Sequence, residues 1–250
     1  MILITIITPV FNSVQYIENC ILNVLQQNIL NVEHLIIDGG SSDGTVEVIK
    51  KYAATNKHIK WISEKDNGQS EAMNKGVKLA KAEYISFLNV DDTYVENIFE
   101  HWKKLIHNND FLFYSGNCNV FNSDGKLNYV SKPQNNNFFK FYFKQTYPIN
   151  PCSYFYKKSI HQEIGYYKTD EHYCMDLEFI LRYMNHFKFY YYEDFVWGNF
   201  YLTATSKTFI DNTQGNMQNR KIELFDYFWK KNNPLLRLFY ILRNKIVDKI

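Results

Sequence analysis

The N-terminal third of the chain alternates short apolar segments with amphipathic ones. Residues 2–8 (ILITIIT) are almost wholly apolar and β-branched, as expected for a strand covered on both faces. Residues 14–27 then place Ile17, Ile21 and Val24 at helical spacing. The same alternation continues with predicted strands at 32–38, 58–63 and 83–89 and helices at 46–53 and 71–81. Such alternation with short connections predicts an α/β fold with a mainly parallel sheet and helices on both faces.

Polar side chains gather where each predicted strand ends. These clusters lie at residues 8–12, 38–43, 64–70 and 89–92. In open parallel sheets, ligands bind beyond the carboxyl ends of the strands. We therefore expect the clusters to meet at one edge of the sheet and to form a binding site there.

The pattern changes after residue 121. Apolar spacing predicts helices at 157–165 and 175–184 and a strand at 187–194. Two further helices are predicted at 213–231 and 235–250, the second after Pro234. The chain is thus expected to divide into residues 1–121, residues 122–210 of the same domain, and a C-terminal helical extension at 211–250.

Composition and charge exclude several classes of function. Lys and Arg number 28 against 26 Asp and Glu, so the chain is not a polycationic nucleic-acid binder. The four cysteines form no C-x-x-C pair, which argues against a zinc or thioredoxin-like motif and suits a reducing compartment. No apolar run approaches the roughly 20 residues of a membrane-spanning helix, and the N-terminus lacks a basic leader and is broken by Pro9. A cytoplasmic protein is predicted.

Five segments resemble glycosyltransferase family 2, in its inverting GT-A form. They occur in the family's order and spacing: TPVFN (8–12), IDGGSSDGT (37–45), SEKDNGQSEAMNKG (63–76), AEYISFLNVDD (82–92) and DLEFILR (176–182). The resemblance is closest to small non-processive bacterial enzymes that build surface polysaccharides such as O-antigen and capsule. It implies a GT-A (Rossmann-like) fold in which residues 1–121 bind a nucleotide-sugar and residues 122–210 bind an acceptor.

Asp91 and Asp92 are adjacent carboxylates at the end of an apolar strand. Such a pair is unfavourable unless water or a cation compensates the charge, and carboxylate oxygens suit Mg²⁺ or Mn²⁺. The resemblance implies a metal site at the diphosphate, with Asp92 on the metal and Asp91 on the metal or the ribose. Asn89 stands where the family often has its first aspartate. The alternative is that Asp92 caps a following helix.

The resemblance also implies the residues that hold the nucleotide. They are Thr8, Pro9, Phe11, Asp38, Asp66, Gly68, Asn74 and Asp91. Asp38 would accept a hydrogen bond from a uracil N3–H, and Phe11 would pack on the base. Asp38 could instead, or at the same time, serve turn chemistry. The alternatives are an ordinary turn at Asp66 and a polar helix position at Asn74.

Asp176 matches the catalytic base of the family. Inverting transfer needs a carboxylate that takes the proton from the attacking acceptor hydroxyl. Glu178 lies two residues away, and helix positions two apart point about 200° from each other. These two carboxylates therefore cannot form the facing pair that a glycosidase requires. The alternative is that Asp176 is a helix-start charge favoured by the helix dipole.

The acceptor side is less well defined by the sequence. The aromatic segments 138–147 and 147–156 suit an acceptor platform or packing between the two halves. Residues 235–250 predict a basic amphipathic helix that either lies on an anionic leaflet or packs on protein. Membrane contact would suit an acceptor on an undecaprenyl lipid. The segment QNRK (218–221) lacks the tryptophan of the processive Q-x-x-R-W element, which favours transfer of one sugar.

Together, these features predict metal-dependent, inverting transfer of one sugar to a saccharide at the inner face of the plasma membrane, from a donor that is uridine-linked by family precedent. An inactive module of the same fold that binds nucleotide or polysaccharide is the alternative. Retention of Asp38, Asp91, Asp92 and Asp176 argues against it, because binding alone needs no base. A nucleotidylyltransferase would need a basic, Gly-rich loop after the first strand, where the chain has TPVFNSVQY. The sugar, the linkage and the oligomeric state stay open.

Overall fold

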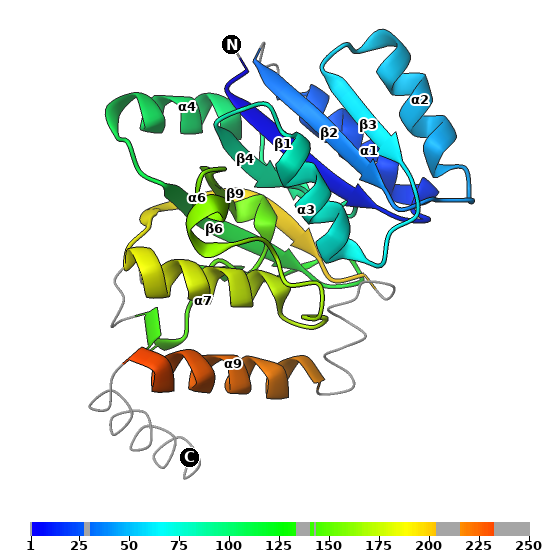
Figure 1. Cartoon of the computed structure of the whole chain (residues 1–250). Coiled ribbons are helices and arrows are strands. Elements are labelled where there is room, and N and C mark those ends of the chain that lie inside the picture. Colours follow the sequence, from blue (N-terminus) through cyan, green and yellow to red (C-terminus); the bar gives the residue numbers. More distant parts are fainter. Residues whose placement is uncertain (1, 28–30, 134–140, 143, 204–215, 233–250) are drawn as a thin grey trace.

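A nine-stranded sheet runs through the computed structural model, which describes residues 2–27, 31–133, 141–142, 144–203 and 216–232. The strands follow the order β3-β2-β1-β4-β8-β6-β9-β5, and β7 pairs with β6. Figure 1 shows β3, β2, β1 and β4 in one part of the sheet. The first half of this order consists of β1 (Ile4–Val10), β2 (Val32–Asp38), β3 (Ile59–Ser63) and β4 (Tyr84–Phe87). The second half consists of β5 (Thr93–Tyr94), β6 (Phe113–Phe121), β7 (Leu127–Ser131), β8 (Tyr154–Lys157) and β9 (Tyr191–Tyr201).

The first half of the sheet is parallel, as predicted. Val10 at the end of β1 pairs with Asp38, and Asp38 pairs with Ser63 at the end of β3. The carboxyl ends of these strands therefore lie at one edge of the sheet. The second half mixes directions, since β8 is antiparallel to both β4 and β6, whereas β9 is parallel to β6.

Helices cover both faces of the sheet. One face carries α1 (Val14–Leu25), α2 (Thr45–Thr55) and α4 (Ile98–Asn108). The other carries α3 (Gln69–Leu79), α6 (Ile160–Ile164) and α7 (Met175–Phe187). Within β1, Ile6 packs toward the first group and Ile7 toward the second, which explains why the strand reads as continuously apolar. Helix α3 and strand β1 approach closely at Gly76, where an added Cβ would lie 2.3 Å from Ile7 Cγ2.

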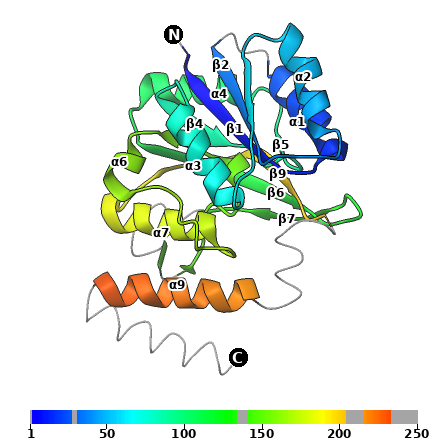
Figure 2. The ribbon, with the colours of Figure 1, turned by 45° about the vertical axis from the view of Figure 1, so that its right-hand side comes forward.

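A further helix lies outside the α7 layer. Helix α9 (Asn216–Asn232) runs alongside α7 on the side away from the sheet (Figures 1 and 2). Its Leu224, Phe225 and Phe228 are buried in the same apolar cluster as the residues of α7. The predicted helix at 213–231 is thus present from Asn216. The helix predicted at 235–250 lies outside the described residues.

Some element boundaries differ from the prediction. The helix expected at 157–165 is shorter, and Gly165, with a φ of 81°, follows its end. Helix α7 continues to Phe187 and ends at Lys188, which adopts the left-handed conformation. The following strand therefore begins at Tyr191 and not at 187. Among the described helices, none has the length and apolarity needed to cross a bilayer.

Candidate functional site

A cavity of about 880 Å³ lies at the carboxyl ends of the parallel strands. Its walls include one residue from the loop after each of β1, β2, β3 and β4, namely Phe11, Gly39, Asp66 and Asp91. The N-terminal turn of α7 contributes Asp176. The polar clusters that the sequence placed at the strand ends do meet here.

The predicted site residues fall into two groups. Those that line the cavity are Pro9, Phe11, Asp66, Gly68, Asp91 and Asp176. Those that are not among its lining residues are Thr8, Asp38, Asn74 and Asp92. The side chains of the second group all make hydrogen bonds within the protein.

Asp91 and Asp92 lie in different surroundings although they are adjacent. Asp91 is half-buried and lines the cavity, and burial raises its pKa. Asp92 is 1% exposed. Its carboxylate accepts hydrogen bonds from Asn89 Nδ2 at 3.1 Å, from Asn150 Nδ2 at 2.8 Å and from the Tyr201 N–H at 3.1 Å. Burial, followed by the neighbouring charge of Asp91, raises the pKa of Asp92 well above its ordinary value.

Asp91, and not Asp92, is among the residues that line the cavity. The Asp92 carboxylate accepts hydrogen bonds from three protein donors, which hold the loop in place, and its role as a metal ligand stays a prediction. The capping alternative is wrong. Asp92 is followed by the short strand β5, and α4 begins only at Ile98 with Asn97 as its N-cap.

The residues around Asp91 suit one kind of metal site. No group of three or more His, Cys, Asp or Glu side chains that could hold a metal occurs within the described ranges of the chain. However, Mg²⁺ commonly binds through one or two carboxylates together with substrate phosphates and water. A half-buried carboxylate on the wall of a large cavity, with the amide of Asn89 beside it, fits a cation that is bound jointly with a diphosphate.

Asp38 and Thr8 are not among the residues that line the cavity. Asp38 is fully buried, and its Oδ2 accepts hydrogen bonds from the N–H groups of Gly40 at 3.1 Å and Ser41 at 3.0 Å and from Ser63 Oγ at 2.6 Å. Its other oxygen accepts from the Ser41 hydroxyl. Asp38 thus has a turn role, and its contact with a base stays a prediction. The Thr8 hydroxyl lies 2.9 Å from His34 Nε2 in the core.

Phe11 has the exposure that base stacking would need. Its side chain is 60% exposed and lines the cavity. The loop after β1 that carries it is held to the loop after β2. The Asn12 N–H donates to Ser41 Oγ at 2.7 Å, and Asn12 Oδ1 accepts from the Ser42 N–H at 2.9 Å. The aromatic ring is therefore presented next to a residue that is held by two hydrogen bonds.

Asp66 and Asn74 differ in their placement. Asp66 lines the cavity and accepts a hydrogen bond from the Gly68 N–H at 3.0 Å. A Cβ at Gly39 would lie 2.8 Å from Asp66 Oδ2, so the loops after β2 and β3 touch only because residue 39 is glycine. The Asn74 side chain exchanges two hydrogen bonds, of 2.8 and 2.9 Å, with the Tyr167 backbone. It ties α3 to the loop before α7, and its contact with a nucleotide stays a prediction.

Asp176 is held at the start of α7. It lines the cavity and accepts a hydrogen bond from the Tyr154 hydroxyl at 3.2 Å. The turn before it is fixed by Glu171, whose carboxylate accepts from the N–H groups of Tyr173 at 3.3 Å and Cys174 at 3.1 Å. A carboxylate in the first turn is favoured by the helix dipole. Asp176 is therefore a positioned carboxylate that reaches the cavity.

Glu178 points away from this cavity, in agreement with the helical geometry expected from the sequence. It is 1% exposed, and Arg182 Nε lies 2.9 Å from each of its oxygens. Lys168 Nζ lies 2.9 Å from Glu178 Oε1. Arg182 in turn donates to the Gly165 and Tyr166 carbonyls. Glu178 is thus part of a buried ion-pair network that joins α7 to the loop before it.

Several residues at the cavity were not named individually as site residues from the sequence. Asn150 supports Asp92, and Tyr147, Met217 and Lys221 form a wall beside the start of α7. Tyr129, Tyr173 and Phe200 add further aromatic surface. Tyr147 falls within the segments predicted as an acceptor platform, whereas residues 138–140 and 143 lie outside the described chain. The sequence did indicate Lys221 as a basic residue of the QNRK segment, within the helix predicted at 213–231.

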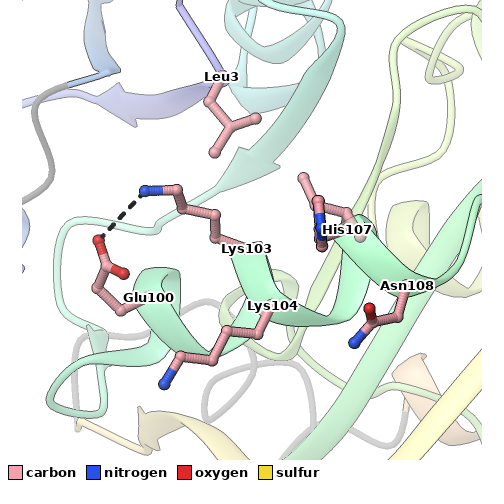
Figure 3. A pocket seen from close by; sticks show the side chains of 7 residues that line it. Leu3, Glu100, Lys103, Lys104, His107 and Asn108 are labelled. Atoms are coloured by element: carbon pink, nitrogen blue, oxygen red, sulfur yellow. Dashed lines mark ion pairs between the residues drawn. The ribbon is translucent and has the colours of Figure 1, made fainter.

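A second cavity lies elsewhere on the molecule and contains none of the predicted site residues. It has a volume of about 530 Å³ and is lined by Leu3 and by residues of α4 (Figure 3). Its Glu100 pairs with Lys103 at 3.7 Å along the same helix. Its lining includes no Asp, Cys or Tyr side chain. The chemistry-bearing side chains are thus concentrated in the larger cavity.

Comparison with known proteins identifies the family of the chain. The model of the family "Glycosyl transferase family 2" matches residues 5–165. The glycosyltransferase GlyG of Streptococcus pneumoniae is 29% identical over 127 residues, which cover 50% of this chain and 42% of GlyG. An uncharacterized glycosyltransferase of Haemophilus influenzae is 32% identical over 136 residues, 53% of this chain and 54% of that protein. The chain therefore matches about half the length of these relatives.

Solved structures share the fold at low sequence identity. TarS residues 1–349 of S. aureus, in complex with UDP, superposes with a TM-score of 0.69 at 14% identity, covering 93% of this chain and 67% of TarS. The mannosyltransferase PcManGT of Pyrobaculum calidifontis, in complex with GDP-Man and Mn²⁺, gives a TM-score of 0.60 at 17% identity, covering 82% and 57%. The predicted GT-A (Rossmann-like) fold is confirmed. With its family model matched over more than half its length, this chain belongs to glycosyl transferase family 2.

Proposed function

We propose that this chain is an inverting, metal-assisted glycosyltransferase that moves one sugar from a nucleoside diphosphate, UDP by analogy with fold relatives, to a saccharide acceptor. The observation that carries the proposal is the presence of Asp91 and Asp176 on the wall of one cavity, from two separate elements. The Asp91 carboxylate is suited to binding a cation at the diphosphate. The Asp176 carboxylate is suited to taking the proton of the acceptor hydroxyl. The complexes of fold relatives with UDP-GlcNAc, UDP and GDP-Man support a nucleotide-sugar donor.

Asp176 acts as the general base in this proposal. The acceptor hydroxyl gives its proton to the Asp176 carboxylate while its oxygen bonds to the anomeric carbon from the face opposite the diphosphate. The bond from that carbon to the diphosphate breaks, and the electron pair leaves with the diphosphate oxygen. Tyr154, which donates to Asp176 Oδ1, holds the base in place. This sequence inverts the configuration at the anomeric carbon.

Asp91 holds the donor end of the reaction. A divalent cation, Mg²⁺ or Mn²⁺, would supply Lewis-acid stabilisation of the leaving diphosphate. Asp91 offers its carboxylate to that cation, and the Asn89, Asn150 and Tyr201 contacts of Asp92 keep the loop in place. Phe11 stacks on the base, with Pro9, Asp66 and Gly68 beside the nucleotide.

The acceptor is proposed to be a lipid-linked saccharide, as in the synthesis of bacterial surface polysaccharide at the inner face of the plasma membrane. The aromatic side chains of Tyr129, Tyr147 and Tyr173 offer faces to its sugar rings. The competing function is a nucleotide-binding module without turnover, which the family's fold would also allow. Such a module would bind the nucleotide without needing the Asp176 carboxylate.

The test combines a donor panel with one substitution. The protein is incubated with UDP-, GDP- and dTDP-sugars and Mn²⁺, and release of the nucleoside diphosphate is followed with and without an acceptor extract. We expect release from one donor class, and its loss in Asp176→Asn with nucleotide binding retained. Binding without release from any donor, in the wild type as in the variant, would establish the module instead.

A further inference from the structure

Helix α9 brings a cation to the reaction cavity. Lys65 and Lys221 are the basic side chains among the residues that line it, against the carboxylates of Asp66, Asp91 and Asp176. Lys65 is exposed and lies in the loop after β3, beside Gly40. Lys221 is half-buried and lies on α9, with its Nζ 5.2 Å from the ring centroid of Tyr147. The two cations thus come from different parts of the wall.

The orientation of α9 is fixed by the residue before Lys221. Arg220 Nε and Nη2 each lie 2.8 Å from Glu171 Oε2. Glu171 is only 4% exposed and also accepts the N–H groups that precede α7. Because this carboxylate belongs to the turn that carries Asp176, the Arg220 contact locks α9 against the start of α7. A salt bridge of this kind is geometrically specific.

The locked helix presents a defined stripe to the cavity. Met217 and Lys221 are four residues apart, so they share one face of α9, and both line the cavity. Tyr147 packs between Lys221 and Phe225, whose ring centroid lies 6.1 Å from its own. The lysine stem therefore follows an aromatic surface, and the residue lines the same cavity as the predicted base. A lysine serving only the solubility of α9 would instead extend into water.

We propose that Lys221 binds a phosphate oxyanion in the cavity and that Arg220 is the positioning residue that brings it there. This inference rests on the proposed function. A nucleoside diphosphate carries a charge of about −3 on release, and one divalent cation leaves about −1, which a nearby ammonium would stabilise. The oxyanion belongs either to that diphosphate or to a phosphate on the acceptor. Both offer the same chemistry to Lys221.

The test is calorimetry with Mn²⁺ on the wild type, Lys221→Gln, Lys221→Arg and the matched control Lys104→Gln, a helix lysine that lines the other cavity (Figure 3). Of UDP, GDP and dTDP, the diphosphate that the wild type binds is titrated beside its nucleoside. If the oxyanion belongs to the donor, Lys221→Gln weakens binding of the diphosphate about tenfold or more and leaves the affinity for the nucleoside unchanged. Lys221→Arg and Lys104→Gln keep wild-type affinity.

A second titration identifies an acceptor phosphate. Inorganic phosphate is added to protein already saturated with the diphosphate. Binding that is present in the wild type and absent in Lys221→Gln assigns the oxyanion to the acceptor. If Lys221→Gln changes neither titration while melting like the wild type, the inference is overturned and Lys221 only packs on Tyr147. If the wild type binds none of the three diphosphates, the proposed function itself has failed.

Arg220 has its own readout. Arg220→Gln should reproduce the Lys221→Gln loss in the affected titration, and Arg220→Lys should recover part of it. If Arg220 has only a structural role, Arg220→Gln would lower the melting temperature. The ratio of the affinities for diphosphate and nucleoside would then stay at the wild-type value. That result would remove its positioning role.

Discussion

The Asn150 side chain donates a 2.8 Å hydrogen bond to the Asp92 carboxylate across 58 positions of sequence. The bond joins the loop after β4 to the residue before the short 3₁₀ helix at Pro151–Ser153. Both partners are buried, at 3% and 1% exposure. The contact thus anchors one member of the aspartate pair in the protein, while its neighbour Asp91 lines the cavity.

Asn150→Ala should therefore impair both stability and metal-dependent binding. Removing the amide leaves a buried carboxylate with one donor fewer, which costs about 1–3 kcal/mol of unfolding free energy. The loop that carries Asp91 loses its anchor, so Mn²⁺ should enhance nucleoside diphosphate binding less. Urea unfolding and calorimetry measure the two effects.

Asn23→Ala is the matched control for this variant. Asn23 exchanges two hydrogen bonds with the Tyr94 backbone and is not among the residues lining the cavity. It should lose comparable stability with unchanged nucleotide binding. Equal binding losses in the two variants would show that Asn150 has no specific role in the site.

Asp176→Asn should separate catalysis from binding. Loss of a general base lowers turnover by about 10²–10⁴-fold, whereas the donor is held elsewhere in the cavity and should bind with unchanged affinity. The initial rate of diphosphate release and the nucleotide Kd measure the two. Asp170→Asn, an exposed carboxylate of the preceding loop, is the control and should retain full activity. Full turnover in Asp176→Asn would exclude this residue as the base.

The Glu178–Arg182 pair should matter for stability. Arg182→Met leaves the buried Glu178 carboxylate without its main partner, and breaking such a pair costs about 3–5 kcal/mol. Lys168→Met removes a half-exposed partner of the same carboxylate and should cost less than about 1 kcal/mol. Urea unfolding of the two variants makes the comparison. Similar losses in both would contradict the account of this network.

Two buried histidines should make the protein sensitive to acid. Burial lowers the pKa of His34 to about 3 and that of His161 to about 4, from 6.5. Between the lowered pKa of each folded-state histidine and the ordinary value of 6.5, the unfolded chain binds more protons than the folded one. The free energy of unfolding therefore falls as the pH falls below about 6.5. The slope is at most about 1.4 kcal/mol per pH unit for each histidine.

His34→Gln tests the larger of these two shifts. The variant should show a shallower loss of unfolding free energy between pH 7 and 5.5, measured by urea titration at each pH. His172→Gln, which changes an exposed histidine, should keep the wild-type slope. An unchanged slope in His34→Gln would mean that this imidazole does not contribute to the acid sensitivity.

The sequence was most informative where one local rule decides the outcome. The β-branched runs and the polar residues after them predicted the parallel strands and their common edge, since strand ends must meet in a parallel sheet. The sequence was less informative about which of the two adjacent aspartates lines the cavity. Asn150 and Tyr201 are distant in sequence and donate hydrogen bonds to Asp92, whereas Asp91 lines the cavity.

Long-range packing also explains the residues that the sequence did not identify. Strand β8 is only four residues long and pairs with β4 and β6 on either side, so its pairing is set by tertiary context. The Asn74 side chain is hydrogen-bonded to the Tyr167 backbone, a contact that its place in a family motif does not indicate. Lys221 reaches the site through the packing of α9 on α7 and the Arg220–Glu171 contact.

The central claim is that Asp91 holds a cation together with the donor diphosphate, and it can be tested most directly by calorimetry. UDP, GDP and dTDP are titrated into the wild type and Asp91→Asn, with and without Mn²⁺. The account predicts that Mn²⁺ strengthens binding of one diphosphate about tenfold or more in the wild type and that Asp91→Asn removes this enhancement while keeping its melting temperature. The same Mn²⁺ enhancement in Asp91→Asn as in the wild type would contradict it.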